Sequence, residues 1–418
     1  MPSNRDEAYE KSVELHRKHG GKMEIRSKVP LLTQDDLSLA YTPGVARVCE
    51  LIAKDKSLAR ELTIKKNTVG IVTDGSAVLG LGNIGPEAAL PVMEGKAILF
   101  REFARVDAIP LCLDTQDTDE LVNVIKAMAP ALGGINLEDI AAPRCFEIEA
   151  RLQDLGIPVF HDDQHGTAIV TQAALINAAR AAGKNYSQLT VVISGAGAAG
   201  RAIAHLLTCF SEEQSWGAVC TAIKDVIVCD SKGAIYEGRP GNTEVKEQLA
   251  KQTNRGGRKG TLKEVLEGVD AFIGVSAPNL LDGDDIRRMA KEPIVLAMAN
   301  PTPEIDPEVA AEAGAKVVGT GRSDYPNQVN NVLAFPGIFR GALDAGATRI
   351  TYAMKLAAAH ALADSVGEPT IERILPNPLD KSVAPKVAKA VQEAWEKGVR
   401  LAGDESGRMP LIDPDEGL

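Results

Sequence analysis

A glycine-rich turn between an apolar strand and a helix constrains the fold of this 418-residue chain more than any other feature. Residues 190–194 (TVVIS) predict a buried strand, residues 195–200 (GAGAAG) follow at once, and residues 201–209 predict the next helix. Glycines at this spacing let the backbone turn tightly and approach the pyrophosphate of a dinucleotide, which then lies at the helix N-terminus. The motif therefore predicts a dinucleotide-binding domain in the second half of the chain.

The strand after this turn ends in a carboxylate that suits a ribose. Asp230 follows the apolar run 225–229, 30 residues after Gly200 rather than the usual ~20, and is placed to accept hydrogen bonds from a ribose diol. Its charge would repel a 2′-phosphate, which favours NAD, although Lys232 could pair with that phosphate instead. We expect NAD as the preferred cofactor and NADP as the alternative. Three further apolar runs end in small polar residues and predict further strands: 271–275, 294–298 and 316–319.

The first half of the chain also alternates apolar strands with helices, and its strand ends are acidic. Open α/β sheets bind ligands at the carboxyl ends of their strands, so these acidic side chains mark a candidate site. We place a first domain over residues 1–162 and a second over residues 163–418. The predicted strands are 68–73, 108–113, 134–135 and 156–160, and the carboxylates at their ends are Asp114, Glu138, Asp139, Asp162 and Asp163.

Composition narrows the class of protein. Aromatic residues make up only 4% of the chain, so Val, Ile, Leu and Ala must form the core, as parallel sheets prefer. A net charge of -11 argues against nucleic acid or an anionic membrane as a partner. The six cysteines are scattered and are interpreted as buried thiols of a reducing compartment. Without a signal sequence or an uncharged apolar run of about 20 residues, we expect a cytoplasmic protein.

Three of the acidic residues have the chemistry of a metal site. Glu138, Asp139 and Asp163 supply hard oxygen ligands, which suit Mg²⁺ or Mn²⁺ better than zinc. Such a metal could also take the carboxylate and hydroxyl of a 2-hydroxy acid and lower the pKa of that hydroxyl. After oxidation, a ketone with a carboxylate on its β carbon loses CO₂ readily. The alternative is that Asp163 is a helix N-cap beside a solvated neighbour.

Lys96 and Tyr41 have two local interpretations each. Lys96 lies near the start of a mostly apolar helix that we expect to begin at Pro91, so its ammonium either reaches solvent or is kept neutral for chemistry. Tyr41 precedes a turn at Pro43-Gly44 and either packs its ring or offers its phenol.

Seven segments together resemble the malic enzymes, and most closely their short bacterial and archaeal branch. They are residues 39–45 (LAYTPGV), 73–76 (TDGS), 80–85 (GLGNIG), 94–96 (EGK), 137–139 (LED), 161–167 (HDDQHGT) and 299–302 (ANPT). The similarity extends over about residues 10–400. It implies oxidative decarboxylation of L-malate to pyruvate and CO₂ with reduction of NAD(P), a side activity on oxaloacetate, and a homodimer or dimer of dimers.

The resemblance also implies roles for individual residues. Lys96 would be the general base at the C2 hydroxyl, Tyr41 the acid that protonates C3, and Asp162 a support of the proton network. Glu138, Asp139 and Asp163 would hold the metal. The residues implied in cofactor binding are Gly195, Ala196, Gly197, Ala198, Ala199, Gly200, Asp230, Ser231, Lys232, Ser276, Asn300 and Asn330, and those implied in malate binding are Ser76, Lys96, Asn300 and Asn331.

One position departs from the family pattern. Larger malic enzymes carry an arginine soon after the Thr-Asp-Gly segment, whereas Ser76 and Ala77 stand there in this chain. Recognition of the malate carboxylates then falls on Ser76 and the asparagines.

The predicted fold class is α/β, with a small parallel-sheet catalytic domain, a Rossmann-type doubly wound NAD(P)-binding domain and C-terminal helices. Two rival functions are a metal-free or non-decarboxylating hydroxy-acid dehydrogenase and a non-catalytic nucleotide sensor. Chelation and CO₂ release discriminate the first. The second is disfavoured because the implied acid, base and metal ligands are all present.

Overall fold

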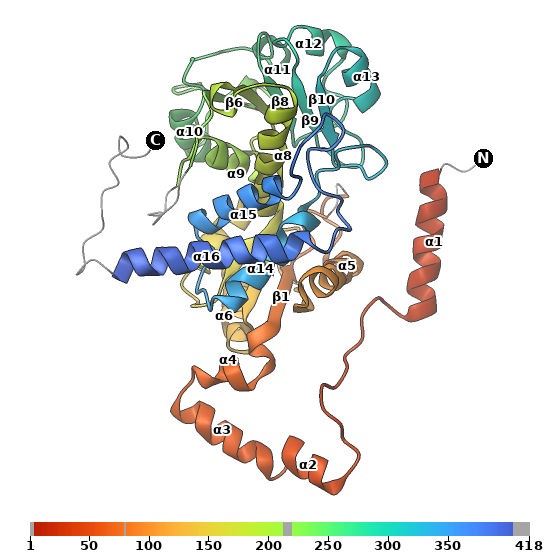
Figure 1. Ribbon diagram of the computed structural model, residues 1–418, viewed down its shortest axis with the longest axis vertical. Coiled ribbons are helices and arrows are strands. Elements are labelled where there is room, and N and C mark those ends of the chain that lie inside the picture. The colour runs from red at the N-terminus through yellow and green to blue at the C-terminus, as the bar shows by residue number, and fades with distance from the viewer. Residues whose placement is uncertain (1–3, 79–80, 212–219, 404–418) are drawn as a thin grey trace.

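The computed structural model describes residues 4–78, 81–211 and 220–403 and shows an α/β protein with two sheets (Figure 1). The first sheet is parallel, in the order β2-β1-β3-β4. Its order reverses between β1 and β3, and the crevice at such a point is where open sheets place ligands. The strands are β1 (Thr68–Thr73), β2 (Asp107–Cys112), β3 (Gly134–Leu137) and β4 (Val159–His161).

The second sheet has the order β10-β9-β8-β5-β6-β7 and is parallel except for β7, which pairs antiparallel with β6. Its order reverses between β5 and β8, so the glycine-rich turn after β5 faces a second crevice. The Rossmann-type prediction is confirmed. The strands are β5 (Thr190–Ser194), β6 (Asp225–Asp230), β7 (Gly233–Ala234), β8 (Ala271–Gly274), β9 (Ile294–Ala297) and β10 (Val317–Thr320).

The helices of the first half include two that carry site residues, α5 (Pro86–Ala104) and α7 (Arg144–Arg151), together with α6 (Thr118–Met128). The prediction that a helix begins at Pro91 is wrong: α5 begins at Pro86, where the fixed φ of proline suits the first turn, and Pro91 lies inside it. Lys96 is therefore in the middle of α5, away from the positive end of the helix.

The second half places helices on both faces of its sheet (Figure 1). They are α8 (Thr167–Ala181), α9 (Ala198–Leu207), α10 (Glu244–Gln252), α11 (Leu262–Val265), α12 (Gly283–Arg287) and α13 (Pro307–Glu312). The C-terminal helices α14 (Phe335–Asp344), α15 (Tyr352–Asp364) and α16 (Val383–Gly403) pack on one another, and α14 and α16 also contact α5 of the first half. Short 3₁₀ turns are η1 (Ile64–Asn67), η2 (Ala129–Ala131), η4 (Tyr186–Gln188) and η5 (Asn331–Leu333). Helix α8 is buried along most of its length and packs against α15, α9 and β9.

Four phenylalanines join the two halves in one hydrophobic cluster. The ring of Phe100 on α5 packs edge-on against Phe335 and Phe339 of α14, with centroids 4.7 and 5.4 Å apart. Phe160 of β4 packs against Phe339 at 5.9 Å. Because C-terminal helices complete the core of the first sheet, the division at residues 162 and 163 stays a prediction.

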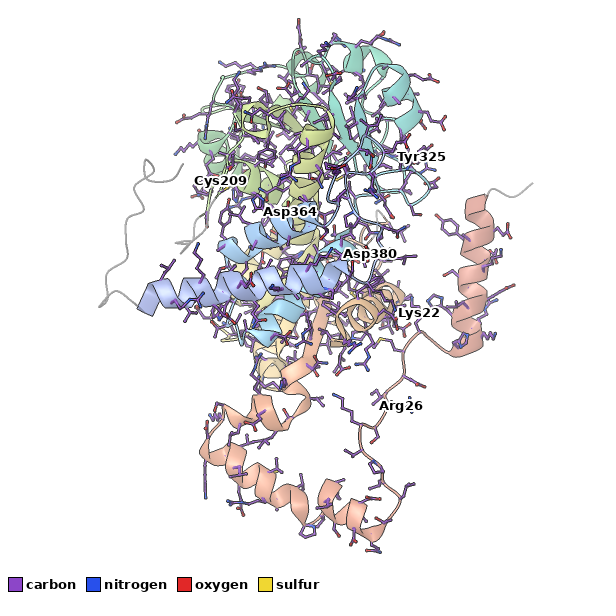
Figure 2. All side chains as sticks on the ribbon, viewed as in Figure 1. Lys22, Arg26, Cys209, Tyr325, Asp364 and Asp380 are labelled. Atoms are coloured by element: carbon purple, nitrogen blue, oxygen red, sulfur yellow. A yellow bond between two sulfur atoms is a disulfide. The ribbon has the colours of Figure 1, made fainter. Side chains whose placement is uncertain are left out.

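Residues 4–63 form an N-terminal arm, of which residues 4–19 and 34–54 stand away from both sheets (Figure 1). The arm contacts the rest of the chain through Lys28, whose ammonium lies 3.3 Å from Asp107 of β2, and through Arg60, which donates to the carbonyl of Leu343. It contains α1 (Asn4–His19), α2 (Gln34–Ala40), α3 (Gly44–Lys54) and α4 (Leu58–Leu62). Helices α2, α3 and α4 have no buried residue. Figure 2 shows Lys22 near α5, where its ammonium donates to the carbonyl of Pro91 at 2.6 Å.

The prediction of six free thiols is wrong for one pair. Cys209, labelled in Figure 2, forms a disulfide with Cys220, their Cα atoms 5.8 Å apart. The fold brings Cys220 within bonding distance of Cys209, just after α9. No spacing motif in the sequence indicates this pair. Cys49 is free but exposed, whereas Cys145 and Cys229 are buried as expected. Across the described residues, none of the helices combines the length and the apolar character that crossing a bilayer would need.

Candidate active site

A turn of π-helix, η3 (Asp162–Gly166), joins β4 to α8 and begins the site. Such turns recur at functional sites because they redirect side chains. The carboxylate of Asp162 folds back across Gly166, where an added Cβ would lie 1.8 Å from Asp162 Oδ1. Only glycine fits there, so Gly166 allows the carboxylate of Asp162 to take this position.

Glu138, Asp139 and Asp163 converge in this structure. One carboxylate oxygen from each lies within 4.8 Å of the others. Consecutive residues of a strand point to opposite faces, but Asp139 has a φ of 53°, which ends the alternation just beyond β3. The backbone N–H of Asp139 donates to Asp163 Oδ2 at 2.8 Å and ties the two strand ends together.

Lys96 reaches this cluster from α5. Its ammonium lies 2.6 Å from Asp162 Oδ2 and 2.8 Å from Glu138 Oε1, and 4.4 Å from the ring centroid of Phe335. The side chain is only 12% exposed, so the interpretation in which Lys96 reaches solvent is wrong.

The cluster of carboxylates around Lys96 carries an excess of negative charge. Burial lowers the pKa of Lys96, but the carboxylates of Asp162 and Glu138 raise it by more, so its pKa lies above the ordinary value. Burial also raises the pKa of Glu138 well above its usual range, and raises that of Asp162. Four carboxylates here face one ammonium. A hard divalent cation fits this donor set, since it offers oxygen ligands and excess negative charge.

Asn331 enters the same site from η5. Its amide nitrogen donates to Asp162 Oδ2 at 3.2 Å and to Thr167 Oγ1 at 3.1 Å. Its neighbour Asn330 instead caps η5, accepting from Val332 N at 3.0 Å. Adjacent asparagines of one loop therefore have different partners.

Ser76 has a cationic neighbour that the sequence did not indicate. Its hydroxyl donates to Asp74 Oδ1 at 2.5 Å and accepts from Arg144 Nη2 at 3.0 Å. Arg144, at the start of α7, also contacts Asp74 Oδ2 at 2.7 Å. The loop after β1 is joined to the metal-ligand segment, because Ala77 N donates to the carbonyl of Asp139 at 2.9 Å. The signal that could have found Arg144 is its place five residues after Asp139.

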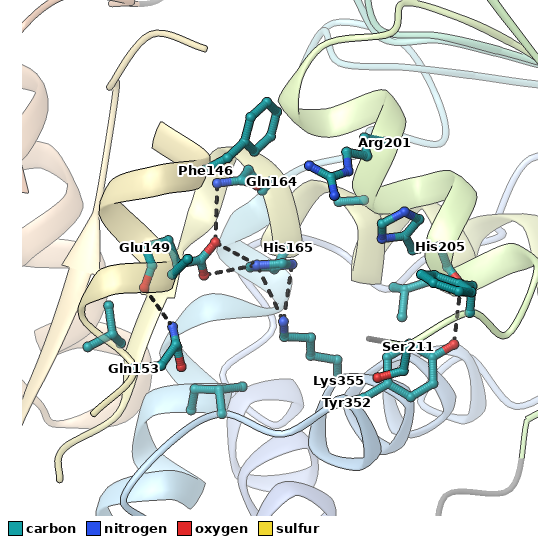
Figure 3. Close-up of a pocket in the computed structure, with 16 residues that line it drawn as sticks. Phe146, Glu149, Gln153, Gln164, His165, Arg201, His205, Ser211, Tyr352 and Lys355 are labelled. Carbon is teal, nitrogen blue, oxygen red and sulfur yellow. Dashed lines mark hydrogen bonds and ion pairs between the residues drawn. The ribbon is translucent and has the colours of Figure 1, made fainter. Parts of the chain in front are cut away.

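The reverse side of η3 lines a cavity of about 220 Å³ between α7, α9 and α15 (Figure 3). Figure 3 shows Glu149 and His165 pointing toward one another, with Glu149 Oε1 2.9 Å from His165 Nε2. Burial raises the pKa of Glu149, but His165, Lys355 and His161 together lower it to about 2. Glu149 also accepts from the backbone N–H of His161 at 3.3 Å. Glu149 was not predicted from the sequence. Its contacts with His161 and His165 fix both ends of η3 on the side away from the metal ligands.

The glycine-rich turn adopts the close packing that its spacing predicts. A Cβ on Gly195 would lie 2.6 Å from the carbonyl oxygen of Val275, and one on Gly200 would lie 1.8 Å from that of Gly195. Ser276 follows β8, and its hydroxyl pairs with Ser194 at 2.8 Å. Asn300 lies exposed just beyond the end of β9. Of the residues proposed for the dinucleotide, Ser276 and Asn300 thus follow the carboxyl ends of β8 and β9, and Asp230 ends β6. Ala196, Gly197, Ala198 and Ala199 lie in the turn after β5 and the first residues of α9.

Comparison with known proteins decides the family. Residues 20–153 match the family described as malic enzyme, N-terminal domain, and residues 164–395 match the malic enzyme, NAD binding domain. The chain belongs to the malic enzyme family. It is similar to a bifunctional malic/malolactic enzyme of Bacillus subtilis, at 56% identity over 97% of this chain and 96% of the relative.

Two further comparisons agree with this assignment. The NAD-dependent malic enzyme of Geobacillus stearothermophilus is 54% identical over 90% of this chain and 77% of that protein. The crystal structure of an NAD-dependent malic enzyme from Thermotoga maritima superposes with a TM-score of 0.86, at 46% identity over 91% of this chain and 98% of that chain.

One residue of the malic enzyme motifs is not brought to the site. Tyr41 is 67% exposed and lies between α2 and α3, in the part of the N-terminal arm that stands apart from both sheets (Figure 1). Within one chain of this malic enzyme, Lys96, Asp162 and the three clustered carboxylates meet, and Tyr41 does not join them.

Proposed function

We propose that this malic enzyme oxidatively decarboxylates L-malate to pyruvate and CO₂, using NAD(P) and a divalent metal ion, Mg²⁺ or Mn²⁺. The observation that carries the proposal is the convergence of Glu138, Asp139 and Asp163 beside the buried ammonium of Lys96. When bound, the cation supplies Lewis acidity at the C2 oxygen of malate and the dinucleotide supplies the hydride acceptor.

The residues of the chain supply proton transfer and orientation. Lys96 takes the proton of the C2 hydroxyl, and Asp162 at 2.6 Å holds the ammonium that forms. A base at this point must first be neutral, and the carboxylates oppose that by raising the pKa of Lys96. A cation bound among those carboxylates would lower the pKa of Lys96 and favour its neutral amine, so the base depends on the metal ligands. Asn331, Asn300 and Ser76 bind the malate carboxylates.

Oxaloacetate fits the same site as a side substrate. It is the ketone that hydride removal from malate would give, and it carries the carboxylate that is lost. We expect CO₂ release from oxaloacetate without any dinucleotide. Lys96 has no hydroxyl proton to remove from this substrate, so the side activity tests the decarboxylation half of the site separately.

Chelation should abolish the activity. We expect EDTA to lower malate-dependent reduction of the dinucleotide by at least about 10²-fold, with recovery on adding Mn²⁺. Absorbance at 340 nm follows the reduction, and trapped CO₂ measured in the same reaction must match it mole for mole. Undiminished activity in EDTA, or reduction without CO₂, would instead support a metal-free or non-decarboxylating dehydrogenase.

The N-terminal arm supports a homodimer. Its apolar side chains are exposed in a single chain, with Ile25 fully exposed, Leu32 at 89%, Leu39 at 79% and Tyr41 at 67%. A segment this apolar requires a covering surface, and burial of large side chains is what stabilises subunit contacts. In a two-fold dimer each arm lies on the other copy, and the same contact occurs twice.

A second copy of this chain is the partner that covers the exposed apolar side chains of the arm. Tyr41, the proposed acid at C3, stands on the arm, apart from the proposed base Lys96 and the proposed metal ligands of its own chain. We therefore propose that each arm delivers Tyr41 to the site of the partner copy. The dimer then is the smallest unit that contains a complete set of acid, base and metal ligands.

A further inference from the structure

The end of β6 carries a charged cluster that bears on the choice between NAD and NADP, which the proposed function leaves open. In a fold of this kind, the adenosine ribose of a dinucleotide lies at the carboxyl end of this strand. Asp230 stands there, and its two oxygens contact Arg239 and Lys246. Both cations belong to the segment between β7 and the first turn of α10.

Hydrogen bonds already occupy the acceptor positions of Asp230. Oδ1 accepts from Lys232 N and Arg239 Nη1, both at 2.9 Å. Oδ2 accepts from Arg239 Nη2 at 2.5 Å and from Lys246 Nζ at 2.6 Å. A carboxylate has about four lone-pair positions. Four donors fill them, so a ribose diol would have to displace one of these donors.

The charge at this point is positive in balance, because three cations stand against two carboxylates, Asp230 and Glu247, the second of which accepts from Gly238 N and Asn242 Nδ2. Arg239 and Lys246 carry two positive charges against the single charge of Asp230. The ammonium of Lys232 adds a third nearby, 3.9 Å from where a Cβ on Gly241 would stand in the same segment. The repulsion of a 2′-phosphate by Asp230, which favoured NAD, is therefore offset within the cluster itself. A phosphate meets a net attraction.

The two paired cations differ in how firmly they are held. The guanidinium of Arg239 is 9% exposed and also donates to Asn242 Oδ1 at 2.9 Å and to the carbonyl of Gly233 at 3.2 Å. It is committed to the fold. Lys246 is 31% exposed, and Asp230 is the acceptor of its ammonium in this structure. A lysine on a flexible stem can turn from one anion to another.

We propose that this site is built for the 2′-phosphate of NADP, with Lys246 and Lys232 as its ligands and Asp230 as a counter-ion positioned by Arg239. The proposal rests on the proposed function only in taking a nicotinamide dinucleotide as the hydride acceptor. When Lys246 turns to the phosphate, the bidentate contact with Arg239 keeps Asp230 neutralised. The cluster can therefore bind the phosphate while the carboxylate of Asp230 stays paired with Arg239.

Binding of nucleotide fragments tests the site without turnover. We expect calorimetry to show adenosine 2′,5′-bisphosphate binding at least about 10-fold more tightly than 5′-AMP, since a charge-assisted contact is worth that much. Lys246→Met should weaken the bisphosphate by about 10- to 100-fold and leave 5′-AMP within about twofold. Lys251→Met, on the exposed last turn of the same helix, is the matched control and should change neither.

Turnover gives the second readout. With malate and Mn²⁺, kcat/KM should favour NADP over NAD in the wild type, and Lys246→Met should remove most of that preference through KM. Equal binding of the two fragments would overturn the proposal. So would a wild-type preference for NAD, or equal weakening of both fragments by Lys246→Met. Absence of malate turnover with either dinucleotide would count against the proposed function alone, because the fragment experiment still decides the phosphate site.

Discussion

Lys96→Ala is expected to lower kcat for malate oxidation by about 10³-fold or more, because a positioned general base contributes roughly 10²–10⁴-fold. The side chain lies between Asp162 at 2.6 Å and Glu138 at 2.8 Å, so its loss removes the proton acceptor and leaves two buried carboxylates facing each other. Dinucleotide affinity should stay within about threefold, since Lys96 belongs to the first sheet's helix α5. Stopped-flow absorbance and calorimetry measure the two quantities.

Two further variants separate chemistry from stability in this experiment. Lys96→Arg keeps the positive charge, but a guanidinium cannot be deprotonated in a protein, so kcat should again collapse. Lys126→Ala, an exposed lysine of α6, should behave as wild type. Melting curves identify any variant that fails to fold. If a folded Lys96→Ala protein oxidised malate at the wild-type rate, another residue would be the base.

Mixing two inactive variants is expected to restore activity. Tyr41→Phe lacks the proposed acid and Lys96→Ala lacks the base, so each homodimer should be inactive. In a mixed dimer with exchanged arms, one site combines an intact Lys96 with an intact Tyr41 from the partner copy. That site should work while the other carries both substitutions. A dimer isolated through two different affinity tags should show about half of wild-type kcat.

The mixed dimer distinguishes exchange from folding of the arm onto its own chain. If Tyr41 served the site of its own subunit, both sites of the mixed dimer would carry one lesion and the sample would stay inactive. Native mass spectrometry confirms that the tested species contains one copy of each variant. An arm that returns Tyr41 to its own chain would thus contradict the dimer proposal while leaving Lys96 as the base.

Local sequence patterns were sufficient to predict the elements whose burial depends on a short stretch of neighbouring residues. Residues 68–73 form β1 as expected, because an uninterrupted apolar run decides this strand. The strand-end rule also predicted that Glu138, Asp139 and Asp163 would meet, since parallel strands present their carboxyl ends at one edge.

Features that depend on contacts distant in sequence could not be predicted in this way. The two-residue strand β7 is too short for a periodic pattern, and it is defined by its pairing with β6. Arg144 and Glu149 look like ordinary charges of an amphipathic helix until the fold places them beside Ser76 and behind η3. Tyr41 is a further case, because the sequence motif that contains it carries no information about which copy of the chain receives it.

Titration of the metal-free protein with Mn²⁺, followed by electron paramagnetic resonance, tests the central claim most directly. We expect one tightly bound Mn²⁺ per wild-type chain. Asp163→Asn should lower the affinity by about 10²-fold or more, since even indirect ligand partners are worth 10–100-fold. Asp154→Asn, an exposed carboxylate of the same half, should leave it unchanged. Wild-type protein that binds no Mn²⁺, or Asp163→Asn that binds it equally well, would contradict the claim that these carboxylates converge on one ion.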